Sequence, residues 1–316
     1  MRTRKENRYD SFEDLSSFEN LYNAHKSCRK GKRWKDSVAI YDIRALESTL
    51  YLQWFLRTGR YSISEYNCFQ VNERGKVRDI KSTKYKDRVV QKSLYDNLLA
   101  PRMMPTLIFE NGASQKGKGT DFQIDELTID LQQFWRRHGT NGYILVCDLK
   151  GYFDSIQHEL VNRIYAGEFS DEKVMALIRH IHASIPGGVG VPLGNQLSQI
   201  DALLAASPVD HMVKERLRVK YYGRYMDDFY LIHTSKEYLQ YCLAEIEKLA
   251  TELGLTLNTK KTKIVPVTTG INFLGFHFYI THTGKVVRRM RPERKNHEKQ
   301  KLRKQLKKVK EGKMTI

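Results

Sequence analysis

The sequence predicts an α+β fold built around a ferredoxin-like sheet. Between residues 142 and 267, apolar runs and helical patterns follow one another in the order strand, helix, strand, strand, helix, strand, which is the split βαβ arrangement. Helical spacing dominates residues 11–60, and residues 288–313 form a strongly basic helical stretch. Because no repeat or low-complexity linker interrupts the 316 residues, we expect one continuous body with a sizeable core.

The composition indicates a polar surface and an anionic partner. Lys and Arg number 54 against 36 acidic residues, a formal net charge of +18, which favours nucleic acid over the alternative of an anionic membrane surface. With no long apolar run and no apolar stretch at the N-terminus, we expect no membrane span and no signal peptide, hence a cytoplasmic protein. The four cysteines form no CxxC pair, so neither a zinc site nor a disulfide framework is expected.

The first half of the chain is predicted to be mostly helical with one hairpin. Helices over residues 11–60 end with "ALESTLYLQWFLRTGRY" at Gly59. Residues 66–81, "YNCFQVNERGKVRDIK", alternate in polarity around Glu73–Gly75, which is typical of a β-hairpin. Helical spacing then returns over residues 86–103.

The second half is predicted to supply the sheet. Its expected elements are a buried strand at 142–149, a helix at 195–217 kinked near Pro208, strands at 218–225 and 229–233, an amphipathic helix from Ser235 to Gly254, and a strand at 261–267. In a ferredoxin-like sheet the first strand lies beside the central hairpin. The end of the first strand is therefore expected to lie next to the turn of that hairpin.

Two regions concentrate the positive charge. Residues Arg288 to Lys313 include 13 Lys and Arg against three Glu, and Leu302, Leu306 and Val309 fall at helical spacing within them. This pattern predicts a cationic helix with one narrow apolar stripe. The segment from Arg29 to Lys35, "RKGKRWK", adds an aromatic ring to its cations, as nucleic-acid contacts often do.

Three carboxylates are expected to meet at one edge of the sheet. Asp148 ends the first strand, and Asp227 and Asp228 occupy the turn of "RYMDDFYLIH". An isolated Asp-Asp pair more often marks a plain hairpin turn, but a strand-terminal Asp beside it favours a metal site. Mg²⁺ prefers carboxylate and phosphate oxygens, and two such ions can activate a hydroxyl and stabilise a leaving pyrophosphate.

Ordered motifs along residues 70–280 resemble those of reverse transcriptases. "VCDLKGYFD" and "YMDD" resemble motifs A and C, "KVRDIKSTKYKDRVVQKSL" and "NGASQKGKGT" the two fingers motifs, "GVPLGNQLSQ" motif B, "GLTLNTKKTKI" motif D and "INFLGFHF" the primer grip. The resemblance implies a right-hand polymerase: N-terminal helices and fingers over 1–141, a ferredoxin-like palm over 142–270, and a primer grip with a short basic helical thumb over 271–316.

The resemblance also assigns roles to residues. Asp148, Asp227 and Asp228 correspond to ligands of two Mg²⁺ ions, with Mn²⁺ as a substitute, and Lys261 to a lysine that protonates pyrophosphate, although Lys260 and Lys263 lie beside it. Phe153 corresponds to an aromatic gate that excludes the 2′-hydroxyl of ribonucleotides; the alternative is a core phenylalanine. The remaining predicted nucleotide-binding residues are Arg78, Lys84, Leu149, Leu193, Gly194 and Gln199, of which Arg78 and Lys84 resemble triphosphate-holding cations or, alternatively, solvated strand positions.

Motif B departs from the pattern of many reverse transcriptases. Leu193 replaces the glutamine before the motif's glycine, and Gln199 replaces the proline after its serine. This pattern resembles the enzymes of diversity-generating retroelements, which copy a template RNA with errors at adenines during mutagenic retrohoming. An aliphatic Leu193 lacks the hydrogen bond that glutamine gives near the nucleotide, so pairing errors are discriminated less well; alternatively, Leu193 only packs.

The resemblance implies template RNA, an RNA/DNA duplex and dNTPs as partners, together with an oligomeric accessory variability protein in a bacterial or phage-encoded system. Two alternatives remain: another bacterial reverse transcriptase, such as a retron, phage-defence or group II intron-like enzyme, and a non-catalytic RNA-binding scaffold. The three retained acids argue against a scaffold, since an inactive descendant has no reason to keep mutually repelling carboxylates together.

Overall fold

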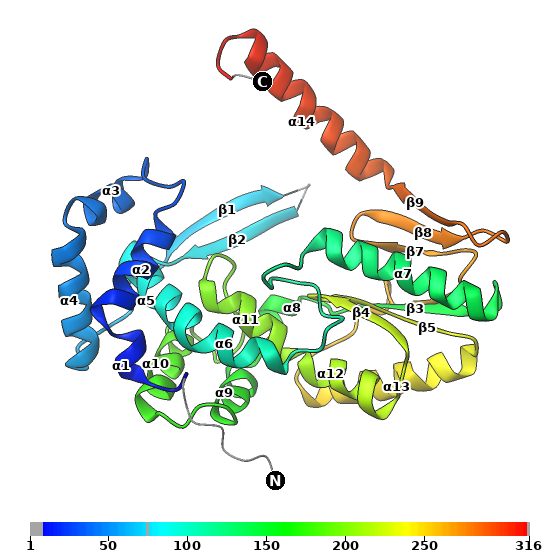
Figure 1. The fold of residues 1–316 in the computed structure, drawn as a ribbon, viewed down its shortest axis with the longest axis horizontal. Coiled ribbons are helices and arrows are strands. Elements are labelled where there is room, and N and C mark those ends of the chain that lie inside the picture. Colours follow the sequence, from blue (N-terminus) through cyan, green and yellow to red (C-terminus); the bar gives the residue numbers. More distant parts are fainter. Residues whose placement is uncertain (1–8, 74–75, 315–316) are drawn as a thin grey trace.

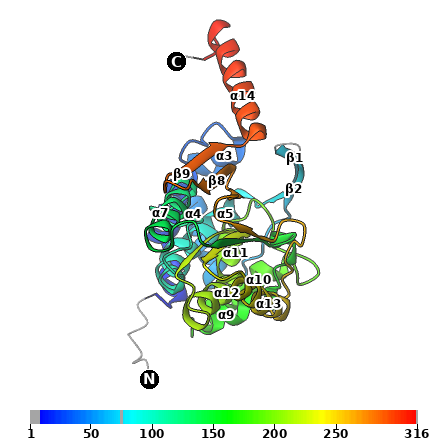
Figure 2. The ribbon, with the colours of Figure 1, turned by 90° about the vertical axis from the view of Figure 1, so that its right-hand side faces the viewer.

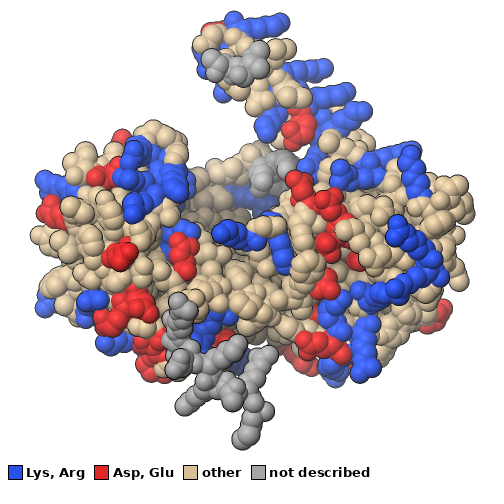
Figure 3. Space-filling model, in the orientation of Figure 1, with Lys and Arg blue, Asp and Glu red and all other residues tan. Residues whose placement is uncertain are grey.

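The computed structural model describes residues 9–73 and 76–314. Two lobes lie side by side, and one long helix projects above them (Figures 1 and 2). The space-filling view shows a hollow between the two lobes (Figure 3). Over these residues no helix is both long and apolar enough to cross a membrane. The turn of the predicted fingers hairpin, Arg74 and Gly75, lies outside the described residues.

The first lobe contains the N-terminal helices, the hairpin and the helices that follow β3 (Figure 1). Its N-terminal elements are α1 (Phe12–Leu15), α2 (Phe18–Cys28), α3 (Asp36–Ile43), α4 (Ala45–Arg57), β1 (Asn67–Glu73), β2 (Lys76–Ser82), α5 (Tyr85–Leu94), η1 (Tyr95–Leu99), α6 (Ala100–Met103) and η2 (Met104–Thr106). The later helices are α8 (Tyr152–Ser155), α9 (His158–Ala166), α10 (Glu172–Ala183) and α11 (Gln196–Ala205). The predicted hairpin is confirmed, because β1 and β2 pair antiparallel.

The second lobe is a four-stranded antiparallel sheet in the order β4–β5–β3–β6. Its elements are α7 (Thr120–His138), β3 (Tyr143–Asp148), α12 (Ser207–His211), η3 (Met212–Arg216), β4 (Tyr221–Tyr225), β5 (Asp228–His233), α13 (Lys236–Glu252) and β6 (Lys263–Pro266). Read in chain order, these strands form the predicted ferredoxin-like arrangement. Antiparallel pairing of β3 with both β5 and β6 puts the first strand in the middle of the sheet.

Alternation along β3 explains why both faces of this sheet are covered. Ile144 and Val146 pack into a core shared with α7, whereas Leu145 and Cys147 pack into the core that contains the buried residues of α13. Successive side chains of a strand point to opposite faces. An almost continuous apolar run therefore fits a strand that is buried on both sides.

A small sheet and the last helix complete the chain. The strands β7 (Ile271–Phe273), β8 (Phe276–Ile280) and β9 (Val286–Met290) pair in order, and α14 (Pro292–Lys310) follows. The predicted basic helix is confirmed, and its apolar stripe is largely exposed: Leu302 is 63% and Leu306 56% exposed, whereas Val309 is half-buried. In Figure 1 α14 points away from the body.

Two predicted boundaries were wrong. The helix expected over 195–217 is interrupted at Ala206, and Pro208 lies in the first turn of α12, where its missing N–H costs no hydrogen bond. The strand expected from residue 218 begins at Tyr221, because the backbone amides of Leu217 and Val219 still bond carbonyls of η3.

Candidate active site

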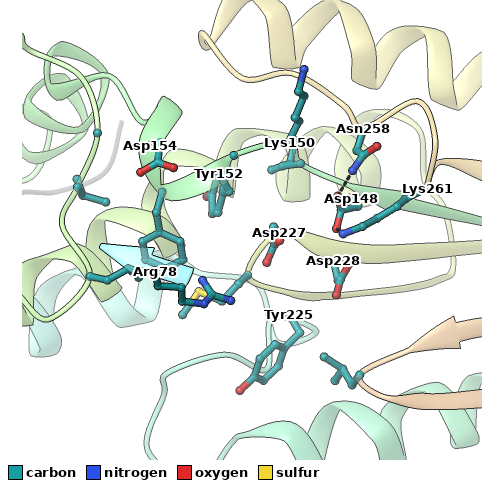
Figure 4. A pocket seen from close by; sticks show the side chains of 18 of the residues that line it. Arg78, Asp148, Lys150, Tyr152, Asp154, Tyr225, Asp227, Asp228, Asn258 and Lys261 are labelled. Carbon is teal, nitrogen blue, oxygen red and sulfur yellow. Dashed lines mark hydrogen bonds and ion pairs between the residues drawn. The ribbon is translucent and has the colours of Figure 1, made fainter. Parts of the chain in front are cut away.

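The three predicted carboxylates meet where β3 and β4 end and β5 begins. Asp148 is the Cα partner of Asp228 in the β3–β5 ladder. Asp227 lies in the turn before β5, and its carbonyl accepts a 3.0 Å hydrogen bond from the Leu149 amide. Figure 4 shows the three carboxylates around the same opening. The sheet register thus brings together acids that are 79 residues apart in sequence.

A buried arginine shapes the turn that carries Asp227. Arg224 is fully buried; its Nε and Nη2 each donate a 2.7 Å hydrogen bond to Asp210, and its Nη1 donates to the Met226 carbonyl at 3.0 Å. Met226 has φ +56°, a left-handed conformation that is uncommon outside glycine. The guanidinium therefore holds a strained residue directly before the metal-ligand candidates.

Two residues of the segment before β6 orient Asp148. The Asn258 side-chain amide donates to Asp148 Oδ1 at 2.9 Å, and Lys261 Nζ lies 2.5 Å from Oδ2. The Asn258 backbone amide also bonds the Asp148 carbonyl at 2.7 Å. Of the three adjacent lysines, Lys261 is therefore the one that forms an ion pair with Asp148. Asn258 was not predicted, although it stands in the quoted motif D segment "LNTKK".

Crowding of like charges perturbs this site. Burial, together with the neighbouring charges of Asp227 and Asp148, raises the pKa of Asp228 to about 7. Burial and Asp148 also raise the pKa of Asp227. For Lys261, burial lowers the pKa, but the hydrogen bond and charge of Asp148 outweigh it and the net pKa is raised. The site has excess negative charge that Lys261 and, at Asp227, Arg78 offset only in part.

This donor set fits a hard divalent cation. Carboxylate oxygens are the ligands that Mg²⁺ takes in proteins, and a cation would relieve the repulsion that raises the Asp228 pKa. Within the described residues no three His, Cys, Asp or Glu side chains already surround one point, and Asp148 is turned toward Lys261 and Asn258. The fit therefore rests on the chemistry of the donors rather than on a preformed cage.

The carboxylates face a cavity of about 1410 Å³ between the two lobes. Four predicted nucleotide-binding residues line it: Arg78 from β2, Leu149 after β3, Phe153 in α8 and Leu193 before α11. The space-filling view shows Lys and Arg on α14 above the central hollow and along its sides (Figure 3). A cavity with carboxylates on one wall and cations around it suits a phosphate-bearing substrate with bound metal.

A family model described as reverse transcriptase (RNA-dependent DNA polymerase) matches residues 70–278. The chain belongs to the reverse transcriptase family. No curated protein matches it significantly. Its fold is similar to that of apo telomerase from Candida tropicalis truncated from the C-terminal domain, with a TM-score of 0.52, 14% identity, and coverage of 77% of this chain and 60% of that one.

Telomerase from Candida albicans in complex with a TWJ fragment of telomeric RNA gives the same TM-score at 13% identity, with 77% and 50% coverage. The reverse transcriptase described here thus spans between half and two thirds of these structures. At such low identity the likeness shows the fold alone. It confirms the predicted right-hand polymerase fold, which the ferredoxin-like sheet and the family match also support.

Three predicted nucleotide-binding residues of the reverse transcriptase are absent from the described lining of the cavity: Lys84, Gly194 and Gln199. The side chains of Lys84 and Gln199 make hydrogen bonds elsewhere. Lys84 Nζ donates to Asn67 Oδ1 at 2.6 Å, which ties the start of α5 to β1. Gln199 accepts a 2.8 Å hydrogen bond from the Ser114 hydroxyl. These two side chains make contacts between protein segments, and their nucleotide contacts stay a prediction.

Motif B of this reverse transcriptase crosses the fingers hairpin closely. The Lys81 amide bonds the Leu193 carbonyl at 3.2 Å. Gly194 has φ +108°, and a Cβ there would lie 3.2 Å from Ile80 Cγ2. Gly194 is therefore needed for backbone geometry and close approach rather than for a side-chain contact with nucleotide.

The base of α14 supplies cations that were not assigned from the sequence. Arg291 and Arg294 both line the cavity. Arg294 Nη1 donates to the Leu274 carbonyl at 2.7 Å, and its guanidinium lies 4.5 Å from the Phe276 ring centroid. The predicted primer-grip turn is thus tied to the basic helix. The charge run in the sequence signalled these arginines, but not which of them face the cavity.

Proposed function

We propose that this protein is an RNA-directed DNA polymerase that copies template RNA into cDNA with two-metal-ion catalysis. The observation that carries the proposal is the β3–β5 register, which pairs Asp148 with Asp228 beside Asp227 at the wall of a cation-lined cavity. The same acids dispersed over the surface would support only RNA binding.

In this proposal Asp148, Asp227 and Asp228 hold two Mg²⁺ ions, with Mn²⁺ as a substitute. When bound, these ions supply activation of a primer 3′-hydroxyl and stabilisation of the leaving pyrophosphate. Lys261, beside Asp148, delivers a proton to the pyrophosphate. Arg78 holds the triphosphate of the incoming dNTP, and positioning by such fixed cations is the main catalytic contribution of a protein to phosphoryl transfer.

Two apolar residues of the cavity are assigned roles in selecting the sugar and the base of the incoming nucleotide. Phe153 is half-buried and lines the cavity, so its ring can close the space that a 2′-hydroxyl needs. Leu193 is also half-buried and lines it. As an aliphatic side chain it offers no hydrogen bond to the nascent base pair, which supports a low-fidelity enzyme of the diversity-generating retroelement type.

The proposed partners are template RNA with its RNA/DNA duplex, dNTPs, and an oligomeric accessory variability protein, in a bacterial or phage-encoded cytoplasmic system. Support for the nucleic acid comes from the Lys and Arg of α14 above the cavity (Figure 3). We also propose the functional division into fingers to residue 141, palm over 142–270 and primer grip with thumb from 271.

The metal-site assignment is tested by primer extension on an RNA template with Mg²⁺. Asp227→Asn should lower the single-turnover rate at least 10³-fold, because a neutral amide binds a divalent cation poorly. Asp154→Asn is the matched control: Asp154 lines the same cavity without belonging to the three acids, so its rate should stay within about 3-fold. Unchanged incorporation by Asp227→Asn would show that the metal-site assignment is wrong, whereas a wild-type protein without any incorporation would favour the RNA-binding scaffold.

The retroelement type is tested separately by sequencing cDNA made on a defined RNA. Errors concentrated opposite template adenines are expected. Uniform accuracy at all four template bases would favour a retron, phage-defence or group II intron-like enzyme instead. Leu193→Gln should then lower the adenine error frequency in the first case and leave it unchanged in the second.

A further inference from the structure

A glycine-rich loop forms one wall of the cavity near Phe153. Pro186, Val189 and Val191 of this loop line the cavity. Its three glycines have φ values of 92°, 68° and 86°: Gly187, Gly188 and Gly190. Glycine adopts such values without strain, yet it also leaves the backbone more conformational freedom than any other residue. The position of this wall must therefore be set by bonds to its surroundings.

His158, at the first position of α9, supplies two of those bonds. Its backbone amide donates to the Gly188 carbonyl at 3.0 Å, and its Nε2 lies 2.8 Å from the Gly190 carbonyl. Since a carbonyl only accepts, Nε2 carries the hydrogen. The side chain is 6% exposed, so little water is available to replace a lost bond.

The loop is bonded in turn to the main chain around Phe153. The Val191 amide donates to the Phe153 carbonyl at 2.8 Å, and the Gly190 amide to the Ile156 carbonyl at 2.8 Å. A Cβ at Gly190 would lie 3.3 Å from the Asp154 carbonyl oxygen. Loop and gate segment are thus in close contact, and a displacement of one shifts the other.

A buried polar cluster packs against the His158 ring. The His182 ring stacks on it with centroids 5.4 Å apart. His182 itself contacts Asn162 Oδ1 at 2.7 Å and Asp201 Oδ2 at 3.3 Å, and the Tyr165 hydroxyl donates to Asp201 Oδ1 at 2.7 Å. This cluster joins α9, α10 and α11. None of these hydrogen bonds and ring contacts involves Asp148, Asp227 or Asp228. None of its members lines the cavity in the described structure.

We propose that His158 is a positioning residue for sugar selectivity: by holding the Gly188 and Gly190 carbonyls, it sets the loop of residues 186–191 against Phe153 and so fixes the gate. This inference rests on the proposed function and on the gate role of Phe153. Discrimination of a 2′-hydroxyl depends on how closely a ring is held under the sugar, since a small displacement opens the required space.

The test compares single-nucleotide addition of dNTP and rNTP by purified full-length variants. His158→Phe keeps a ring to stack on His182 but cannot donate to Gly190, whereas His158→Gln places an amide donor near the position of Nε2. The ratio of kcat/KM for dNTP over rNTP should fall roughly 2- to 12-fold in the phenylalanine variant, the effect of one neutral hydrogen bond, and recover in the glutamine variant. His180→Phe, an exposed histidine on α10, is the matched control and should keep the ratio.

Action through the gate is tested by a double-mutant cycle. In a Phe153→Ala background, which lacks the ring, His158→Phe should lower the selectivity ratio no further. The proposal would be overturned if the effects of Phe153→Ala and His158→Phe on the selectivity ratio were fully additive. It would also be overturned if His158→Phe and His158→Gln lowered the ratio equally, or if His158→Phe left it unchanged. A purely structural role would lower the melting temperature without moving the ratio.

A second measurement separates this inference from the proposed function. Amide hydrogen exchange at Gly190 and Val191 should be faster in His158→Phe than in wild type, and restored in His158→Gln. A wild-type protein that adds neither nucleotide overturns the polymerase proposal. The exchange rates then still test whether His158 holds the loop of residues 186–191: unchanged exchange in His158→Phe shows that the ring does not hold it.

Discussion

At the scale of single residues, the site is a balance between crowded carboxylates and the groups that offset them. Asp148 is held by Asn258 and Lys261, while burial and the other two acids raise the pKa of Asp228. Lys261 is 55% exposed and pairs with the 5% exposed Asp148. It can therefore offset this charge and still reach a leaving group in the cavity.

Replacing Lys261 tests its proposed role as a proton donor. Lys261→Met removes the proposed proton donor, and we expect the single-turnover rate of nucleotide addition to fall by about 10²- to 10⁴-fold, the usual contribution of a general acid. Rapid quench measurements on a primer–template check this. Lys260→Met, at a neighbouring cation that also lines the cavity, should fall less than 10-fold; equal losses would contradict the assignment to Lys261.

Asp130, which is not one of the three proposed metal ligands, makes the stability of the fold depend on pH. Burial raises the pKa of Asp130 from 3.8 to about 7, partly offset by a 2.9 Å hydrogen bond from the Tyr230 hydroxyl. The unfolded chain loses this proton near pH 4 and the folded chain only near pH 7. Between these values the unfolded state binds fewer protons, so this residue lowers stability as the pH rises.

Asp130→Asn should remove that contribution. The free energy of unfolding of the wild type relative to the variant should fall between pH 4 and 7 by on the order of 1 kcal/mol at this half-buried position, and then level off. Urea denaturation across the pH range measures the difference. A difference that does not change with pH would show that Asp130 titrates normally.

At the scale of elements, the β4–β5 turn depends on a buried ion pair. Arg224 and Asp210 are both fully buried, and the pair joins β4 to α12 while also bonding Met226. The Asp210 carboxylate raises the pKa of Arg224 despite its burial. Breaking one side leaves an uncompensated charge in the core, whereas removing both does not.

Arg224→Met should therefore cost about 3–5 kcal/mol of unfolding free energy, and Arg224→Met with Asp210→Leu should recover much of that loss. Both are measured by urea denaturation. The double variant should still polymerise slowly, because the Met226 carbonyl has lost its donor. If the single substitution costs less than about 1 kcal/mol, the pair does not hold the turn.

At the scale of the whole molecule, α14 projects over the hollow between the two lobes with its cations exposed (Figures 1 and 3). It has no buried residue, so packing on the body does not explain its sequence. Its Lys and Arg stand above a cavity that Arg291 and Arg294 also line. A polyanion in that hollow would be contacted from the fingers, the palm and α14 together.

Neutralising part of α14 should weaken duplex binding in a salt-dependent way. With Lys301, Lys304 and Lys308 changed to Gln, the slope of log affinity against log salt should fall by about 0.9 for each lost phosphate contact. Binding of an RNA/DNA duplex is measured by fluorescence anisotropy. Lys236→Gln with Lys248→Gln on α13, on the opposite side of the body (Figure 1), is the control, and an equal loss there would show that only net charge matters.

Local patterns were sufficient for most of the fold. The Ser235 hydroxyl accepts from the Tyr238 amide and Gly254 has φ +74°, so the predicted start and end of α13 are confirmed. The hairpin and the palm strands followed from alternation and apolar runs, whose periods depend only on neighbouring residues. The kink predicted near Pro208 is a full break at Ala206, because Pro208 begins a new helix instead of bending one.

By itself, the sequence determined that Asp148 ends a strand and that Asp227 and Asp228 occupy a turn, because short-range chemistry and motif order carry that information. Only the tertiary structure decided that Asn258 and Lys261 hold Asp148, that Lys84 and Gln199 bond other protein segments, and that His158 braces the wall beside Phe153. These contacts join residues far apart in the chain or depend on rotamers and burial. No local pattern specifies them, since packing selects the partner only after the elements have assembled.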